Sequence, residues 1–351
     1  MEQLSFFKSE DLDVPSYVQR IPDIELLPLE EYDHIIVSMS GGKDSMACLF
    51  HLLNVGVPTQ KLELWHQCVD GRGEQYREFV DWPVTESYIE AVGKHFGIPT
   101  HFQWRDGGFH RELMRSNERT GDVYYTEGNA VHCLPTKQGK LSTRRKWPAV
   151  SPDLRVRWCS PYLKIDVFRR VLNNSIRFLG KNVLVITGER REESANRARY
   201  AEKELHSCHS SKRLVHAWRP VINWTEEQVW AEFRERKFHP HPAYLLGFNR
   251  CSCFSCIFAD PSTFTVMGEI APKRLDKLIQ VEKEIDHTID PKRVTIEKKV
   301  QLGSLSKLPN DPRVQEWVQL ALGHTFDTRQ LTMKEWIAPF GAFKGGCDGP
   351  N

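Results

Sequence analysis

The chain has 351 residues, of which 40% are hydrophobic and 27% are charged, and its formal net charge is +2. These values are typical of a soluble globular protein and allow a large core in one or two domains. The acidic N-terminal stretch MEQLSFFKSEDLDVP excludes a signal peptide, and the lack of about 18 uninterrupted apolar residues excludes a membrane span, so we expect a cytoplasmic protein.

Beyond residue 33, apolar runs alternate with amphipathic stretches. The apolar runs predict strands at 34–40, 62–69 and 100–104, and the amphipathic stretches predict helices at 43–55 and 83–95. Strands that alternate with helices form parallel sheets with right-handed crossovers. We therefore predict an α/β fold with a Rossmann-like parallel sheet flanked by helices.

Residues 106–157 interrupt this alternation, because they are rich in Gly, Arg, Pro and Trp, and we interpret them as a long functional insertion. The alternation then resumes with predicted elements, which are a helix at 161–173, a strand at 182–187, a helix after Gly188 and a capped helix at 225–236. Pro and Gly interrupt the charged residues 257–351, which predicts a smaller, mainly helical region with a flexible tail. The expected parts are an N-terminal extension at 1–33, an α/β domain at 34–256 and the helical region at 257–351.

Positive charge is concentrated between Lys137 and Arg170, where ten Lys or Arg are accompanied by two Asp. One interpretation is a solvated basic surface, which is what most charge runs are. The other is an electrostatic footprint for a polyanion. Trp147 and Trp158 favour the second interpretation, because they interleave with the cations and offer stacking surfaces.

A glycine turn with the sequence SMSGGKDS, at 38–45, separates the first predicted strand from the first predicted helix. Glycines let backbone N–H groups approach an anion, and the helix N-terminus adds the positive end of its dipole. Ser40 and Ser45 offer hydroxyl donors, and Lys43 offers a positive charge. Asp44 would repel a phosphate unless it binds Mg²⁺, which we favour, or caps the helix. The Walker pattern does not fit, because an aspartate follows the lysine and a valine replaces the first glycine.

The hexamer SGGKDS resembles the PP-loop of the ATP-pyrophosphatase superfamily, in the same position between a strand and a helix. The resemblance implies an adenine nucleotide alpha hydrolase-like fold and a loop that grips the β- and γ-phosphates of ATP as a leaving pyrophosphate. It also implies Mg²⁺, attack of an acceptor on the α-phosphorus, and catalytic roles for Lys43 and Asp44. The residues expected to contact the nucleotide are Ser38, Ser40, Gly41, Gly42, Lys43, Asp44, Ser45, Asp70, Gly188 and Glu193.

Four more stretches resemble one branch of that superfamily, the PAPS-reductase-like proteins. They are RWCSPYLK at 157–164, TGERREESANR at 187–197, RPVINWTEEQVW at 219–230 and GFNRCSCFSC at 247–256. Together with the loop they agree in order and spacing with that branch. We interpret Trp224 and Trp230, in the third stretch, as core residues.

The stretch TGERREESANR follows a predicted parallel strand, and α/β sheets bind ligands at the carboxyl ends of their strands. Arg190 and Arg197 are therefore expected to act as catalytic residues that neutralise phosphate or developing negative charge. Glu193 is expected to orient an arginine rather than to act as a base. The alternative is that these residues form a salt-bridged helix surface.

Nine cysteines, three of them crowded into 251–256, indicate metal, cluster or redox chemistry in a reducing compartment. Cys159, Cys253 and Cys256 occupy positions that match the resembling branch, and such a set fits a [4Fe–4S] cluster, which we favour, or Zn²⁺. Cys251 is a candidate fourth ligand, and for zinc Cys133 or a histidine is another. Reduced cysteines packed as small hydrophobes are the alternative.

Three other cysteines have different interpretations. We expect Cys48 and Cys68, beside the predicted sheet, to be core residues. Cys347 lies in a glycine-rich C-terminal tail and is interpreted as a catalytic thiol, a sulfur carrier or an exposed thiol.

Within that branch the chain most resembles the ATP-pyrophosphatase component of bacterial DNA phosphorothioation systems, the DndC and SspD type. The resemblance implies adenylylation of a DNA backbone phosphate and sulfur insertion, as part of antiviral defence. Its implied partners are DNA, bound through 137–170, a cysteine desulfurase and other phosphorothioation-system proteins, and it allows a homodimer. The alternatives are a PAPS or APS reductase that forms sulfite with thioredoxin, thiolation of tRNA or a small molecule, and a regulatory module without turnover.

Overall fold

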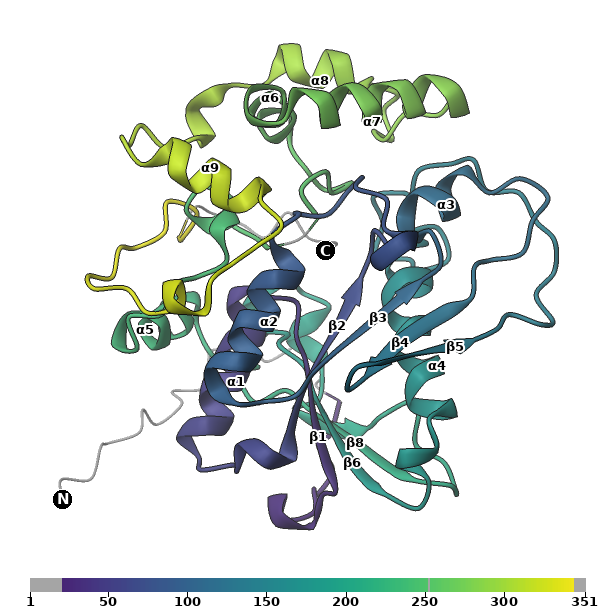
Figure 1. The fold of residues 1–351 in the computed structure, drawn as a ribbon, viewed down its shortest axis with the longest axis vertical. Helices are drawn as coiled ribbons and strands as arrows, with labels where there is room; N and C mark the ends of the chain where they lie inside the picture. Colours follow the sequence, from purple (N-terminus) through teal and green to yellow (C-terminus); the bar gives the residue numbers. More distant parts are fainter. Residues whose placement is uncertain (1–20, 252, 344–351) are drawn as a thin grey trace.

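A single eight-stranded sheet forms the centre of the molecule in the computed structural model, which describes residues 21–251 and 253–343 (Figure 1). Its strand order is β5-β4-β3-β2-β1-β6-β8-β7. The strands are β1 (His34–Ser38), β2 (Leu62–Cys68), β3 (Thr100–Arg105), β4 (Val123–Glu127), β5 (Ala130–Leu134), β6 (Asn182–Ile186), β7 (Lys203–Leu205) and β8 (Leu214–Trp218).

The middle of the sheet is parallel, as predicted, and its edges are not. Strands β3, β2, β1, β6 and β8 run parallel to one another, whereas β4, β5 and β7 pair antiparallel at the edges. The β4–β5 pair is a hairpin, and antiparallel neighbours need no crossover helix. The prediction of an α/β fold with a Rossmann-like parallel sheet is therefore confirmed, and the sheet has antiparallel strands added at both edges.

Helices cover both faces of the sheet, and the sheet separates a larger apolar core from a smaller one. Helices α1 (Lys43–Asn54), α2 (Thr85–Phe96) and α5 (Glu226–Glu235) pack on one face, where Val37, Leu49 and Ile89 lie in the larger core. Helix α4 (Asp166–Asn174) packs on the other face, where Phe168 and Val185 lie in the smaller core. The predictions for these four helices agree with the structure to within two residues, except that a turn of π-helix at Pro161–Ile165 precedes α4.

Two stretches differ from their predictions. Residues 106–157 do not form one insertion, because they contribute α3 (Gly108–Met114) and the hairpin β4–β5 before a long loop begins. No helix follows Gly188, where residues 191–199 contain two single 3₁₀ turns instead. The guanidinium of Arg191 donates to the carbonyls of Ala198 (2.8 Å) and Tyr200 (2.7 Å), which fixes this irregular path in place of a helix.

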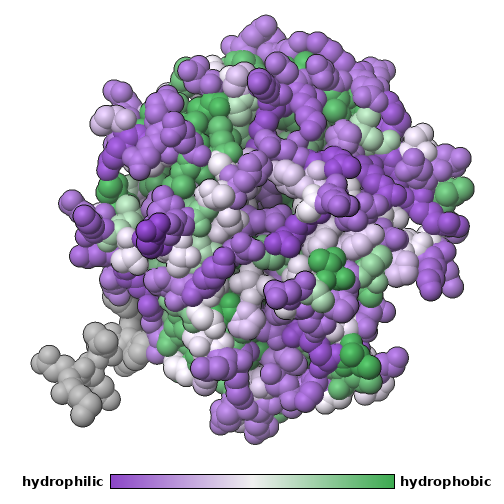
Figure 2. All heavy atoms as spheres, in the orientation of Figure 1, coloured by the Kyte–Doolittle hydropathy of each residue, from purple (hydrophilic) through white to green (hydrophobic). Residues whose placement is uncertain are grey.

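The C-terminal helices lie beyond the carboxyl ends of the parallel strands (Figure 1). They are α6 (Pro261–Ile270), α7 (Pro272–Ile285), α8 (Ile296–Leu302) and α9 (Val314–Leu322). Phe264, Leu278 and Trp317 from this layer belong to the same core as the helices on the sheet. A hollow lies between the layer and the sheet edge in the space-filling view, and mostly hydrophilic residues surround it (Figure 2). Within the described ranges, no helix combines the length and apolar character that a bilayer crossing requires.

Candidate functional site

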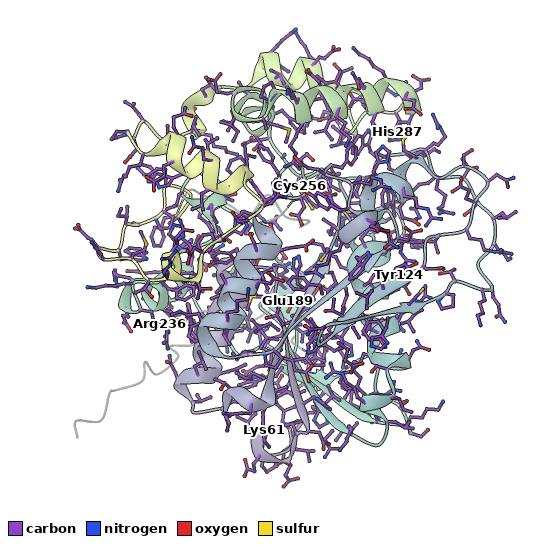
Figure 3. All side chains as sticks on the ribbon, viewed as in Figure 1. Lys61, Tyr124, Glu189, Arg236, Cys256 and His287 are labelled. Carbon is purple, nitrogen blue, oxygen red and sulfur yellow. The ribbon has the colours of Figure 1, made fainter. Side chains whose placement is uncertain are left out.

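The glycine turn lies at the carboxyl end of β1, where successive strands of the chain change from one side of β1 to the other. The chain builds β1, β2 and β3 in one direction and then returns to place β6 and β8 on the other side of β1. Ligands of open α/β sheets bind at such a switch point, beyond the carboxyl ends of the strands. Figure 3 labels Glu189, just after β6, at this edge, and Cys256 between the edge and the C-terminal helices.

Internal hydrogen bonds fix the shape of the turn. Gly41 has a φ of +77°, a backbone conformation that disfavours any side chain. The hydroxyl of Ser45 donates to the carbonyl of Gly42 (2.9 Å) and lies 3.2 Å from the hydroxyl of Ser40. The Ser40 hydroxyl also accepts from the Gly42 N–H (3.2 Å). Helix α1 begins at Lys43, so the positive end of its dipole lies at this turn. We call residues 40–45 the cradle, because a glycine turn before a helix N-terminus is a geometry that suits an anion.

Lys43 and Asp44 are held in a buried charge network. The Asp44 carboxylate accepts from Nε of Arg190 (2.6 Å), and the Lys43 ammonium lies 3.5 Å from Asp44 and 3.7 Å from Glu226. Burial would raise the pKa of Asp44, but the charges of Lys43 and Arg190 outweigh it and lower that pKa. The N-cap of α1 is Gly42, without a side-chain cap, so the alternative that Asp44 caps the helix is wrong.

Arg190, which the sequence predicts as a phosphate ligand, is buried and bonded to other groups of the protein. Its residue is 2% exposed, and besides Asp44 it contacts the Glu192 carboxylate and the carbonyl of Trp224 (3.2 Å). Its guanidinium therefore positions Asp44. Arg197 is more open, with 31% of its side chain exposed, and it pairs with Glu193. Glu193 also accepts from the Arg190 N–H (2.8 Å), so its carboxylate is placed to orient arginines.

Gly188 is required by close packing rather than by a ligand. A Cβ there would lie 2.8 Å from the Asp44 carbonyl carbon and 2.9 Å from the Ser45 nitrogen, both in the backbone of α1. The end of β6 can therefore touch the first turn of α1 only if residue 188 has no side chain. This contact sets the position of the loop against Arg190.

Two other predicted nucleotide contacts lie apart from the cradle. The buried Asp70 carboxylate accepts from the amides of Phe79 (2.9 Å), Val80 (2.9 Å) and Asp81 (2.9 Å). It therefore fixes the 79–81 turn, and its bonds leave little capacity for a nucleotide. Ser38 ends β1 as a half-buried residue, paired in register with Trp65.

Tyr244, which no local pattern singles out, joins the loop to the cysteine segment. Its buried hydroxyl accepts from the Lys43 N–H (2.9 Å), 201 residues away, and also from the Cys251 N–H. The Cys251 thiol in turn contacts the Ser40 carbonyl (3.8 Å). Cys251 therefore lies against the phosphate loop, and only the folded chain shows this.

The other three cysteines of the predicted metal set gather around Lys164. Burial raises the pKa of the Cys159 thiol, the neighbouring Cys256 raises it further, and Lys164 opposes both. Burial and Asp81 likewise raise the pKa of Cys253, which also interacts with Cys256 and Lys164. Burial and the like charge of Asp70 raise the pKa of Asp81 to about 7.

These thiols do not form a metal cage in the structure. Among residues 21–251 and 253–343, no three His, Cys, Asp or Glu side chains have a geometry that could hold a metal ion. Cys251 faces the loop, and Cys133 lies exposed on β5. We derive no step through a cluster or zinc. Cys48 and Cys68 are buried, as predicted, and Cys347 lies outside the described residues.

The tryptophans of the basic segment are not stacking surfaces. Trp147 and Trp158 are 3% and 4% exposed, so that prediction is wrong. Trp147 stacks on Phe79, and the guanidinium of Arg144 covers Trp158 at 4.3 Å. Trp158, which lies close to cations in the sequence, is thus packed beneath one of them, Arg144. The prediction for Trp230 is confirmed, because it is buried in the core, whereas Trp224 is only partly buried and packs against that core.

Comparisons with known proteins agree with this arrangement. A family model described as the phosphoadenosine phosphosulfate reductase domain matches residues 34–259. A 37.8 kDa protein of Escherichia phage 186 is 25% identical over 263 residues, which cover 71% of this chain and 74% of the relative. The adenosine 5′-phosphosulfate reductase of Burkholderia cepacia is 31% identical over 169 residues, 48% of this chain and 62% of that enzyme. A protein of Methanocaldococcus jannaschii is 27% identical over 133 residues, 38% of this chain, and the match spans only 26% of that relative.

Proposed function

This chain belongs to the phosphoadenosine phosphosulfate reductase domain family, whose sulfur chemistry uses nucleotides, and on that premise we propose that it is an ATP pyrophosphatase acting on DNA. It activates a DNA backbone phosphate for sulfur insertion, in a bacterial defence system with a cysteine desulfurase. The observation that carries the proposal is the preformed SGGKDS cradle at the switch point of the sheet.

In this proposal the cradle holds the β- and γ-phosphates of ATP. The positive end of the α1 dipole attracts the phosphates to the turn, and Lys43 neutralises charge on the leaving pyrophosphate. Mg²⁺ in such sites takes one or two carboxylates together with substrate phosphates and water. Asp44 fits that role, because its carboxylate has a lowered pKa and is 19% exposed.

The proposed reaction has three steps. A non-bridging oxygen of the DNA phosphate attacks the α-phosphorus of ATP, and pyrophosphate leaves. The terminal sulfur of a persulfide then attacks the adenylylated DNA phosphorus, and AMP leaves with the former DNA oxygen. A second thiol cleaves the remaining S–S bond, which leaves a phosphorothioate in DNA and a disulfide. Arg197 and Lys164 are the more exposed cations placed to balance the negative charge.

DNA reaches this site along the basic segment. Lys137, Lys140 and Lys146 are exposed, and within the described part of the chain no carboxylate lies at ion-pair distance from them. Two other cations of the segment are already paired, Arg145 with Glu284 and Arg155 with Asp153. The three free lysines are therefore the ones that support polyanion binding.

A reductase is the second candidate, and the 31% identity to an adenosine 5′-phosphosulfate reductase favours it. Such an enzyme would attack the sulfur of a nucleotide sulfate with a thiol and release sulfite. It would hold a nucleotide monophosphate rather than a triphosphate. It would neither release pyrophosphate nor respond to DNA.

Pyrophosphate release from ATP by the purified protein tests the proposal, with and without DNA, a persulfide donor and Mg²⁺. We expect pyrophosphate rather than phosphate, stimulation by DNA, and loss of release when EDTA removes Mg²⁺. Lys43→Ala is expected to abolish release, and the exposed Lys334→Ala is the control. Sulfite formation from a nucleotide sulfate, with no pyrophosphate under any condition, would replace the proposal by the reductase.

A further inference from the structure

A polar pocket of about 350 Å³ lies at the carboxyl end of β3, apart from the glycine-turn cradle. Its lining residues come from the 72–78 turn, the β3–α3 junction, helix α3 and the segment between α3 and β4, and they are Arg77, Asp106, Gly107, His110, Arg111, Met114, Arg115 and Glu118. None of these residues has a role in the chemistry proposed above. Three of the side chains are guanidinium groups.

The arginines of the pocket differ in how far their charges are balanced. Arg77 is exposed and donates only to the carbonyls of Glu74 (2.9 Å) and Tyr76 (2.8 Å), and no carboxylate of the described residues lies at ion-pair distance. Arg111 pairs with Asp106. The charge of Arg77 is therefore not balanced by a carboxylate of the described residues. The guanidinium of Arg111, which lines the same pocket, has more N–H donors than its pair with Asp106 uses.

Behind the pocket, two guanidinium groups share one carboxylate. The fully buried Glu112 lies 3.3 Å from Arg115 and 3.4 Å from Arg144. Two positive charges beside one negative charge leave a local excess of one positive charge. Glu118 at the rim is the opposing charge, and its exposed carboxylate would repel an anion. The pocket therefore favours an anion, and Glu118 limits its affinity.

The basic segment that is proposed to bind DNA is hydrogen-bonded to the rim of the pocket. The N–H of Arg144 donates to the Arg115 carbonyl (2.8 Å), and Glu118 pairs through its backbone with Ser142. A strand of DNA that follows the free lysines toward the cradle would pass this rim. The pocket and the cradle also share one edge of the sheet, because both follow the carboxyl ends of parallel strands.

We propose that this pocket is a second phosphate site, which holds a DNA backbone phosphate within a few nucleotides of the phosphate that is modified. Strands are about 4.8 Å apart, so the ends of β1 and β3 are separated by roughly 10 Å. A few nucleotides of one DNA strand span such a distance. The site fixes which DNA phosphate lies at the α-phosphorus of ATP. This inference rests on the proposed DNA substrate.

Binding of a fluorescein-labelled DNA oligonucleotide, measured by anisotropy over a range of salt concentrations without ATP, tests the site. Arg77→Gln and Arg111→Gln are each expected to weaken binding about tenfold and to lower the slope of log K against log salt by about 0.7 to 0.9. Glu118→Gln is expected to strengthen binding, because it removes the repelling charge. Arg329→Gln, an exposed arginine paired with Asp327 outside the pocket, is the matched control.

Neutral methylphosphonate substitutions, placed one at a time along the oligonucleotide, identify the phosphate. We expect one position, within a few nucleotides of the modified phosphate, whose neutralisation weakens binding of the wild type and leaves Arg77→Gln unaffected. Wild-type DNA binding that all three pocket variants leave unchanged would overturn the second site and leave the proposed function intact. No wild-type DNA binding at all would overturn both. A loss of ATP affinity in Arg77→Gln, with DNA binding unchanged, would assign the pocket to the nucleotide and overturn the inference.

Discussion

Replacing Arg190 by glutamine tests whether this guanidinium acts through Asp44 or directly on a substrate. The Arg190 side chain is almost wholly buried, and its Nε lies 2.6 Å from the Asp44 carboxylate. Glutamine removes the charge and leaves Asp44 with Lys43 alone, at 3.5 Å. The structure assigns Arg190 a positioning role, so loss of its guanidinium should weaken nucleotide binding at the loop and lower the free energy of unfolding.

The size of the effect follows from the burial of the pair. Two unit charges about 4 Å apart attract by roughly 4 kcal/mol at an effective dielectric constant of about 20. Removing one partner of a fully buried pair costs about 3 to 5 kcal/mol. Asp44 keeps Lys43 and is 19% exposed, so a smaller loss of unfolding free energy, about 2 kcal/mol, is expected.

A double-mutant cycle with Asp44→Asn separates the two roles. Unfolding in urea and nucleotide binding are measured for the wild type, both single variants and the double variant. If Arg190 acts through Asp44, the double variant loses less than the two single variants together, with a coupling energy of about 1 to 3 kcal/mol. Arg213→Gln, a buried arginine whose partner is the neutral Asn173, is the control. Additive losses, or weaker nucleotide binding in Arg190→Gln without any loss of stability, would refute the positioning role.

Three further substitutions probe the contacts that shape the site and the sheet. Tyr244→Phe removes the acceptor of the Lys43 N–H, so pyrophosphate release should fall about tenfold while the circular dichroism spectrum is unchanged. Gly188→Ala places a Cβ 2.8 Å from α1 and should cost about 1 to 3 kcal/mol in urea unfolding together with nucleotide binding. Burial would raise the pKa of Glu63, but hydrogen bonds from His34 and Arg177 outweigh it and lower the pKa from 4.5 to about 2. The resulting stability, about 3 kcal/mol, is present above pH 4.5 and is lost as the pH falls toward 2, so Glu63→Gln should be less stable at pH 7 and vary less with pH over that range.

The parallel part of the fold was predictable because its signals are local. The β-branched run at 34–37 and the amphipathic stretch after Lys43 each specify their element without help from distant residues. The capping box of α5, in which Thr225 and Gln228 exchange hydrogen bonds, is equally local. The same holds for the cradle, since its shape comes from bonds among residues 40–45.

The parts that the sequence did not predict depend on contacts between distant residues. The antiparallel β7 exists because Lys203–Leu205 pairs with β8, a strand that comes later in the chain. The Arg191 guanidinium, bonded to two carbonyls, replaces the predicted helix by turns. Tyr244 reaches the loop across 201 residues, and no periodicity or spacing encodes such a contact. Side chains that act through tertiary contacts carry no local signature.

The charged residues of the site show why the sequence alone assigns some of them the wrong role. A sequence in which arginines follow a strand suggests that each one meets a phosphate. A buried charge must instead be balanced within the protein before any ligand arrives, because an unpaired charge is costly to bury. Arg190 is balanced by Asp44 and Glu192, and Lys43 lies between Asp44 and Glu226. The side chains around the cradle are thus close to neutral as a group, so in the proposed function the dipole of α1 adds to the charge of Lys43 in attracting a phosphate. The turn that brings a phosphate to the start of α1 depends on the positive φ of Gly41.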